Sequence, residues 1–118
     1  MSKIAEDTYD LLNKMFPACT ILKEVYVKYK YTRLFFDYYI RELGVYVEVQ
    51  GRQHVEFVKH FHGDKQTFVG QKRRDNMKLQ YIQENSKLCL VRLYYNEKIT
   101  EDLVRRKLDE ALNGGFCE

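Results

Sequence analysis

Apolar residues recur along this chain with two different spacings, and each spacing predicts one kind of element. Steps of three and four positions are typical of amphipathic helices, and they occur over residues 4–16, 67–85 and 100–112. Pro17 ends the first helix, and Thr100 caps the last one, which Gly114-Gly115 terminates. We therefore expect three helices, placed near the start, the middle and the end of the chain.

Four stretches rich in Val, Tyr and Phe are predicted to be β-strands. They cover residues 21–29, 33–40, 45–51 and 88–94. A four-residue turn joins the second to the third, which indicates an antiparallel hairpin. The fourth stretch is apolar almost throughout, so we expect a central strand buried on both faces.

Residues 52–67 follow neither spacing and hold all three histidines, which indicates a functional or flexible loop. The resulting element order is α-β-β-β-α-β-α. It predicts one α/β or α+β domain over residues 1–118, with a mixed central sheet flanked by helices. Repeats, low-complexity segments and linkers are absent from the sequence, so any contacts with nucleic acid are expected from this domain itself.

The composition is that of a globular protein, with 45% hydrophobic and 31% charged residues. The net charge of +3 is only a weak indication of a nucleic-acid partner. The basic residues are concentrated between positions 65 and 80, where Asp75 is the one acidic residue, and they include Lys72, Arg73, Arg74 and Lys78. A solvated helix face is the simplest interpretation of such a run, and a phosphate-binding surface is the alternative.

Three cysteines without metal-binding spacing indicate reduced thiols, as in a cytoplasmic protein. The N-terminus does not have the pattern of a signal peptide, and no apolar run approaches the length of a membrane span. We therefore expect an intracellular protein without a membrane partner.

Asp37 and Glu48 are the most informative pair in the hairpin. If Ile40 pairs with Val45, the two carboxylates lie directly opposite each other on neighbouring strands. Like charges in this position repel, and burial among aromatic and branched side chains increases the cost. A hard divalent cation such as Mg²⁺ would compensate both charges, so the pattern predicts a metal-dependent enzyme of phosphate chemistry.

Strand alternation separates the hairpin into two faces. It places Asp37, Glu48 and Gln50 together on one surface patch. The opposite, core-packed face is expected to consist of Leu34, Phe36, Tyr38, Val45, Val47 and Val49. A polar outer face is common in antiparallel sheets, but this one also carries aromatic residues, which are less typical of solvent decoration: Phe35, Tyr39 and Tyr46.

Four segments together resemble the PD-(D/E)XK nuclease superfamily, and more narrowly its very-short-patch-repair-like branch, which includes small phage and homing endonucleases. They are residues 36–40 (FDYYI), 47–54 (VEVQGRQH), 73–78 (RRDNMK) and the apolar run 88–94. Each segment alone is a weak signal, whereas their combination over about residues 20–95 is fairly specific. The resemblance implies a restriction-endonuclease-like core and makes a phage origin plausible.

The resemblance also implies a metal site. Asp37, Glu48 and the carbonyl of Val49 would hold Mg²⁺, for which Mn²⁺ could substitute. Glu24 on the preceding strand is a further acidic candidate.

Three other residues would arrange the attacking water. Gln50 occupies the place where the superfamily usually has lysine, and it could orient a water or contact phosphate, although it cannot carry a positive charge. His54 would be the general acid/base or the water-positioning group. Asp75 would support His54 or the water.

DNA is the expected partner. The residues expected to contact its phosphates are Arg52, Lys72, Arg73, Arg74 and Lys78. Some tyrosines could stack on bases, although packing in the core or at its rim is the usual role of such residues: Tyr26, Tyr29, Tyr31, Tyr94 and Tyr95.

The predicted function is therefore that of a Mg²⁺-dependent endonuclease that nicks or cleaves DNA. Two alternatives remain open: a resolvase of Holliday junctions or branched DNA that acts as a homodimer, and a nucleic-acid- or protein-binding module without catalysis. A zinc cluster of His54, His60 and His62 is less favoured because no cysteine lies at zinc-ligand spacing. A nucleophilic pair of Cys89 with His54 is less favoured because Cys89 lies in an apolar run.

Overall fold

A mixed β-sheet organises the chain. The computed structural model describes residues 3–51 and 65–117, and within them one domain with five strands and three helices. The strands lie in the order of the sequence: β1 (Ile21–Tyr29), β2 (Thr32–Ile40), β3 (Val45–Gln50), β4 (Cys89–Tyr94) and β5 (Phe116–Cys117). Strands β1, β2 and β3 are antiparallel, whereas β4 pairs in parallel with both β3 and β5.

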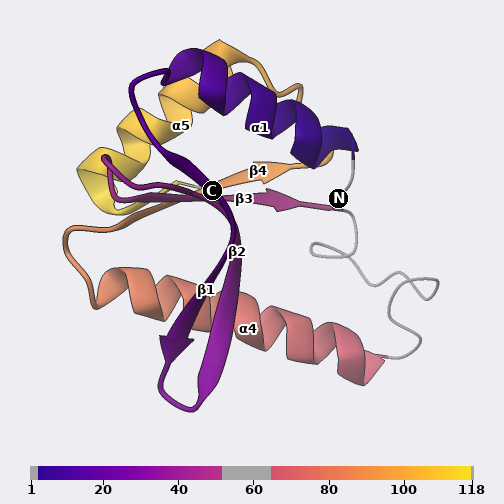
Figure 1. Cartoon of the computed structure of the whole chain (residues 1–118). Helices are drawn as coiled ribbons and strands as arrows, with labels where there is room; N and C mark the ends of the chain where they lie inside the picture. The colour runs from indigo at the N-terminus through magenta and orange to yellow at the C-terminus, as the bar shows by residue number, and fades with distance from the viewer. Residues whose placement is uncertain (1–2, 52–64, 118) are drawn as a thin grey trace.

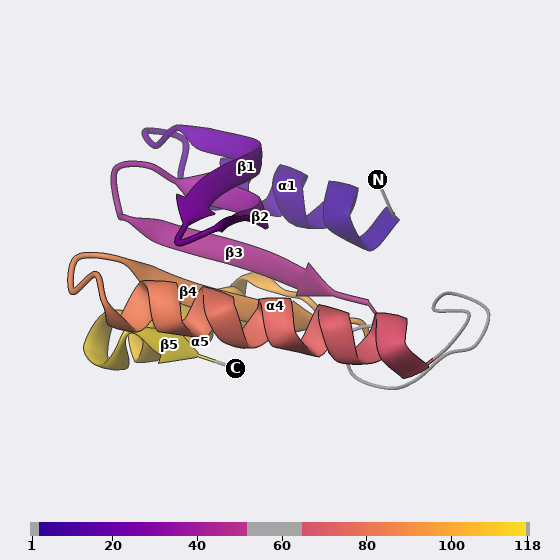
Figure 2. The same cartoon turned by 90° about the horizontal axis from the view of Figure 1, so that it is seen from below.

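The helices cover the sheet from both sides. Helices α1 (Lys3–Met15) and α5 (Glu101–Gly114) lie on one face, and α4 (Lys65–Gln83) lies on the other. Figures 1 and 2 show the three layers, with the long β1–β2 hairpin curving from the α1 side toward α4. This α+β architecture gives the sheet two buried faces, and therefore two apolar cores.

The larger core lies beneath α1 and α5. It includes Leu12 of α1 and Val104, Leu108 and Ala111 of α5, packed on buried residues of β2, β3 and β4. Helix α5 has the predicted boundaries: the Thr100 hydroxyl accepts a hydrogen bond from the amide of Leu103, 3.2 Å away.

The second core lies beneath α4 and is richer in aromatic residues. Phe36 and Tyr39 each pack on Tyr46 with ring centroids 4.3 Å apart. Ile82 of α4 is buried there, and Tyr81 packs at its edge. Apolar residues of α4 from Met77 to Ile82 pack in this core. Their packing holds the helix across the sheet face that carries the polar residues of β3.

Most of the predicted elements are confirmed. The helices and the first four strands lie where the apolar spacing predicted them, with ends that differ by a few residues. Strand β4 is buried from Cys89 to Leu93, as expected of a central strand. Strand β5 was not predicted, because two residues after Gly115 are too few to show any alternation.

The predicted division of β2 between the two faces is wrong. Tyr38 packs with Val45 and Val47 in the larger core, but Leu34 and Phe36 belong to the core beneath α4. The long hairpin coils between these positions, since twist accumulates along a pair of strands. Opposite the change of face, Glu24 of β1 has a left-handed φ of 51°.

All three cysteines are free thiols, in agreement with the expectation from their number and spacing. Burial raises the pKa of the Cys117 thiol to about 11, and the neighbouring Glu110 carboxylate adds to this effect. None of the helices in the described part of the chain has the length and apolar character needed to cross a membrane.

The turn between β2 and β3 depends on Gly44. Its φ is 66°, and a Cβ atom added there would lie 2.7 Å from the backbone oxygen of Lys87. We expect Gly44→Ala to lower the free energy of unfolding by about 2 kcal/mol or more, because the left-handed backbone and the clash add up. Urea unfolding measures the change.

Gly114→Ala is the matched control for this prediction. A Cβ at position 114 has nothing within 4 Å. Alanine there is expected to leave stability unchanged or to raise it by a few tenths of a kcal/mol. Equal unfolding midpoints for the two variants would contradict the account of the turn.

Candidate active site

The carboxyl end of β3 carries the polar residues that the sequence singled out. The predicted hairpin register is confirmed, with Ile40 paired to Val45 and Tyr38 paired to Val47. Asp37 and Glu48 are the next residues along the two strands. Here the amide of Val49 donates a hydrogen bond to Asp37 Oδ2, 2.8 Å away.

The face that carries Glu48 and Gln50 is buried, although the alternation pattern indicated a surface patch. Helix α4 returns across it, and the exposed fractions of Glu48 and Gln50 are only 3% and 2%. Of the aromatic residues predicted on the same face, Tyr39 and Tyr46 belong to the core beneath α4, whereas Phe35 packs on the exposed Tyr26 instead. The predicted surface patch is therefore corrected to a polar cluster inside the protein, while Asp37 at its edge is half-buried.

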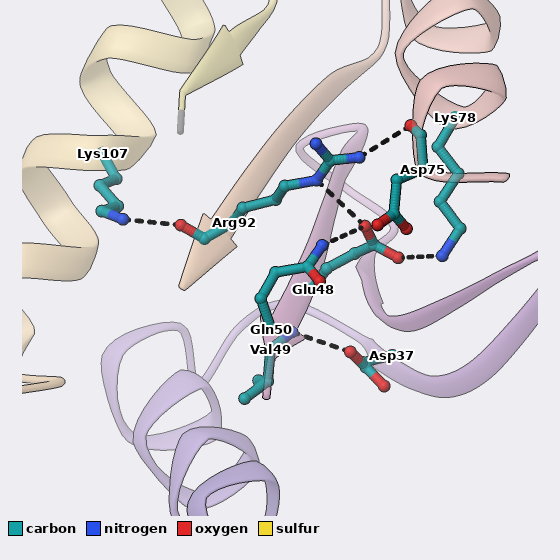
Figure 3. Close-up of polar contacts among 8 residues, drawn as sticks. All are labelled: Asp37, Glu48, Val49, Gln50, Asp75, Lys78, Arg92 and Lys107. Atoms are coloured by element: carbon teal, nitrogen blue, oxygen red, sulfur yellow. Dashed lines mark hydrogen bonds and ion pairs between the residues drawn. The ribbon is translucent and has the colours of Figure 1, made fainter. Parts of the chain in front are cut away.

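Glu48 is the centre of this cluster. Its Oε1 atom lies 2.5 Å from Lys78 Nζ, and its Oε2 atom lies 3.3 Å from Arg92 Nε (Figure 3). The side-chain amide of Gln50 donates to Oε2 over 3.3 Å. Arg92 is also the residue that pairs with Glu48 across the parallel strands β3 and β4. Two cations from different elements therefore converge on one carboxylate.

Asp75 is a second residue of α4 in the cluster, beside Lys78. It precedes Lys78 by one helical turn on α4, so the two residues share a helix face, and both are buried. The Asp75 carbonyl accepts a hydrogen bond from Arg92 Nη2, 2.9 Å away. Figure 3 shows its side chain directed toward Glu48. We call Glu48, Gln50, Asp75, Lys78 and Arg92 the Glu48 cluster.

Burial and charge act in opposite directions on Glu48. Burial raises the pKa of its carboxyl group, and the nearby charge of Asp37 adds to that effect. The positive charges of Lys78 and Arg92 lower the same pKa. Burial is the largest of these effects, so the pKa of Glu48 stays above its usual value. Lys78 and Arg92 are the groups that favour the ionised form, which is the form that can bind a cation or accept a proton.

Gln50 has one atom without a partner. Its amide nitrogen contacts Glu48, but its buried Oε1 has no hydrogen-bond partner among the described residues. A buried carbonyl oxygen without a partner is uncommon, because desolvation without a compensating bond is costly. A bound cation or a water molecule would satisfy it.

The oxygen atoms of the site fit Mg²⁺. Carboxylate and amide oxygens are the hard donors that this ion prefers, and it usually binds one or two protein carboxylates together with waters and substrate phosphates. Asp37, Glu48 and the unsatisfied oxygen of Gln50 are such donors. A closed cage of protein ligands is not formed by the described residues, where no group of three or more His, Cys, Asp or Glu could hold a metal ion.

Lys78 was predicted to lie on a DNA-binding surface, but it is buried in the Glu48 cluster. Its exposed fraction is 8%, so it is not part of a solvated phosphate-binding face. Arg73 and Arg74 of the same helix are exposed, as that prediction requires, and Lys72 is half-buried. The reason is helical geometry. Lys78 follows Asp75 by three positions and so lies on the same buried face of α4, whereas Arg73 and Arg74 lie on other faces of the helix.

Among the described residues, Glu24 is the predicted acidic site residue that the structure does not bring to the cluster. Glu24 is exposed on the edge strand β1, in contrast to the buried members of the cluster. Arg52 and His54 lie outside the described residues, as do His60 and His62.

Arg92 and Lys107 were not predicted from the sequence. Lys107 of α5 is buried and donates to the Arg92 carbonyl over 2.7 Å and to Glu97 over 2.6 Å. It therefore supports the backbone of the strand that carries Arg92. A signal for Arg92 was present: it is the single charged residue in the otherwise apolar strand β4, and a buried charge needs a partner.

One viral protein is similar in sequence to part of this chain. The chain is 33% identical over 72 residues to "Uncharacterized protein 307L" of Invertebrate iridescent virus 6. The match covers 61% of this chain and 36% of that protein, so the chain spans about a third of the length of this relative. No protein-family model matches the chain, and no solved structure matches it. The case for a function therefore depends on the geometry of the site.

Proposed function

We propose that this protein is a metal-dependent DNA endonuclease that hydrolyses phosphodiester bonds, built on a restriction-endonuclease-like core. The observation that carries the proposal is the Glu48 cluster beside Asp37. Two carboxylates and an unsatisfied amide oxygen lie together with two buried cations at the end of a central strand. Hydrolysis of a phosphodiester needs both kinds of group: oxygen donors for a metal, and positive charge near the phosphate.

Asp37, Glu48 and Gln50 would hold the metal in this proposal. When bound, Mg²⁺ would polarise the phosphate and lower the pKa of water in the site. Lys78 and Arg92 set the charge of the site, because they favour ionised Glu48 and offset the negative charge that phosphate brings. The proposed general acid/base remains His54, which lies outside the described residues, with Asp75 as its support.

The cluster also supplies the positive charge that Gln50 lacks. Glutamine stands there in place of the lysine that the superfamily usually has, and it brings no charge. Lys78 from α4 brings an ammonium group to within 2.5 Å of Glu48, the neighbour of Gln50 on the same strand face. We infer that Lys78 takes over the part of the missing lysine.

A second candidate function is a binding module without catalysis. It is favoured by one observation: both oxygens of Glu48 already contact cations of the chain, as in a purely structural ion-pair network. In that case the cluster would hold α4 on the sheet, and the protein would not cleave DNA with or without a metal.

Asp37→Asn tests the two candidates. We expect the parent protein to nick supercoiled plasmid or cut a four-way junction with Mg²⁺ or Mn²⁺, and not with chelator. The variant is expected to cut at least about 100-fold more slowly, because asparagine is a far weaker metal ligand than aspartate. Its side-chain oxygen can still accept the Val49 amide hydrogen bond, so the fold should persist.

Asp109→Asn is the matched control, since Asp109 is exposed on α5 and the charge change is the same. It is expected to cut like the parent, and circular dichroism should show both variants folded. Cleavage that persists in chelator, or equal rates for Asp37→Asn and the parent, would overturn the nuclease proposal. Pure protein that binds DNA but cuts none of these substrates would favour the binding module.

A further inference from the structure

The hairpin of β1 and β2, here called the ribbon, has two different faces. Its inner face packs on the core beneath α4 and consists of Val25, Val27, Tyr29, Leu34 and Phe36. On the outer face Lys28 pairs directly with Arg33, and Tyr26 pairs with Phe35. Figure 1 shows that the ribbon crosses α4 and that its turn extends beyond that helix.

The charges on the outer face of the ribbon do not stabilise the fold. Lys28 and Arg33 are both exposed, and like charges directly opposite on paired strands repel. Tyr26 beside them is 64% exposed and rests on Phe35 with ring centroids 5.1 Å apart. Exposed cations thus lie beside the exposed Tyr26 and the half-buried Phe35, and a bound anion would remove the repulsion.

The charge of the ribbon has one sign over most of its length. Its exposed cations outnumber its exposed acid, Glu24, and they are Lys23, Lys28, Lys30 and Arg33. With Asp37 counted as a second acid, four cations less two acids leave the ribbon at +2, so most of the net charge of +3 of the 118 residues lies in this short segment. The ribbon is therefore an electropositive arm attached to the sheet edge.

The turn of the ribbon also contains residues that do not stabilise the fold. Lys30 and Tyr31 form a two-residue loop, a position where Asn-Gly or another glycine pair is preferred because φ is positive. Lys30 has φ of 54°, and Tyr31 is fully exposed to solvent. A strained lysine and an exposed tyrosine at the end of an arm are placed for contact with another molecule.

We propose that the outer face and the turn of the ribbon bind duplex DNA. A two-stranded ribbon fits the major groove, which is about 12 Å wide, and lysine and arginine side chains contact the phosphates along its edges. From Tyr31 the strand runs about 20 Å to Asp37 at roughly 3.3 Å per residue. The ribbon would thus hold the duplex within about one helical turn of the candidate active site. The choice of DNA as the ligand rests on the proposed function.

The test is the affinity for a fluorescein-labelled DNA duplex in chelator, measured by fluorescence anisotropy without cleavage. We expect Lys28→Gln/Arg33→Gln to bind about tenfold more weakly at 0.15 M salt. The slope of log affinity against log salt should fall by about 2, because each phosphate contact contributes about 0.9. The matched control is Lys87→Gln/Lys98→Gln, which removes two exposed lysines away from the ribbon and should bind like the parent.

Thermal unfolding shows whether the binding loss is a folding defect. Removal of the opposed charges relieves repulsion, so the melting temperature of Lys28→Gln/Arg33→Gln should not fall below that of the parent. Lys30→Gly should raise the melting temperature, because glycine accepts positive φ without strain, and should weaken DNA binding severalfold. Stability and affinity that change in opposite directions are the expected signature of a binding surface.

The outcomes separate this inference from the nuclease proposal. Weaker binding by the ribbon variants than by the control supports the ribbon, even if the parent never cuts DNA. Parent-like affinity of the ribbon variants overturns it, while Mg²⁺-dependent cleavage that Asp37→Asn abolishes would leave the nuclease proposal standing. A parent protein that binds single strands, RNA or anionic vesicles but not duplex DNA also overturns it.

Discussion

Glu48→Ala is expected to lower the free energy of unfolding by about 3–5 kcal/mol. The substitution leaves Lys78 and Arg92 buried without the carboxylate that neutralises them, and an unpaired buried charge is far more costly than the loss of a contact. It also removes the acceptor for the Gln50 amide. Urea or guanidinium unfolding followed by circular dichroism measures the loss.

Glu101→Ala is the control for this prediction. Glu101 forms an ion pair with Lys14 over 3.7 Å, but the Lys14 side chain is 78% exposed and the Glu101 side chain 42%. Water screens such a pair, so its loss should cost less than about 1 kcal/mol. If the two variants unfold at the same denaturant concentration, the cations of the cluster are hydrated in solution and the description of a dry, charged cluster is wrong.

This expectation changes how the catalytic role of Glu48 can be tested. An inactive Glu48→Ala protein would show either a lost metal ligand or a lost fold, whereas Asp37→Asn separates the two. The cluster itself is also informative. Apolar residues of similar volume often give a buried site equal or greater stability than an ion-pair network, so several buried charges held by β3, β4 and α4 are more easily explained by chemistry than by stability.

The hairpin shows what the sequence could predict. Strand alternation and the short turn were sufficient for the register of Ile40 and Val45, and this register brings Asp37 next to Glu48. These are local properties, set by pleat and turn geometry. Alternation distinguishes two faces of a strand, but it does not reveal which face a distant helix covers.

The cluster shows what could not be predicted. Lys78 is 30 positions from Glu48 and Arg92 is 44 positions from it, so no spacing rule links them. The basic run between positions 65 and 80 predicts that Lys78 contacts DNA phosphates, whereas the structure buries it. Its buried position follows from the packing of α4 on the sheet, which depends on residues such as Ile82 and Phe36 rather than on the charges.

Lys78→Met is the second substitution with a large expected effect, and it tests the part that Lys78 plays. Methionine matches the length of the side chain without its charge, and Arg92 remains to pair with Glu48. We expect DNA cleavage with Mg²⁺ to slow by about 10²–10³-fold, the range found when one preorganised electrostatic group is removed. Affinity for DNA in chelator should change less than about threefold, because Lys78 is buried.

Arg73→Met on the same helix should behave in the opposite way. Arg73 is exposed, so its loss should weaken DNA binding and lower the salt slope by about 1, with a near-parental rate at saturating protein. Lys78→Arg keeps the charge and should recover part of the lost rate if charge is what the site needs. A Lys78→Met protein that cuts DNA at the parental rate but binds it poorly would show that Lys78 contacts phosphate. It would also contradict the proposal that the charge of Lys78 in the Glu48 cluster contributes to catalysis.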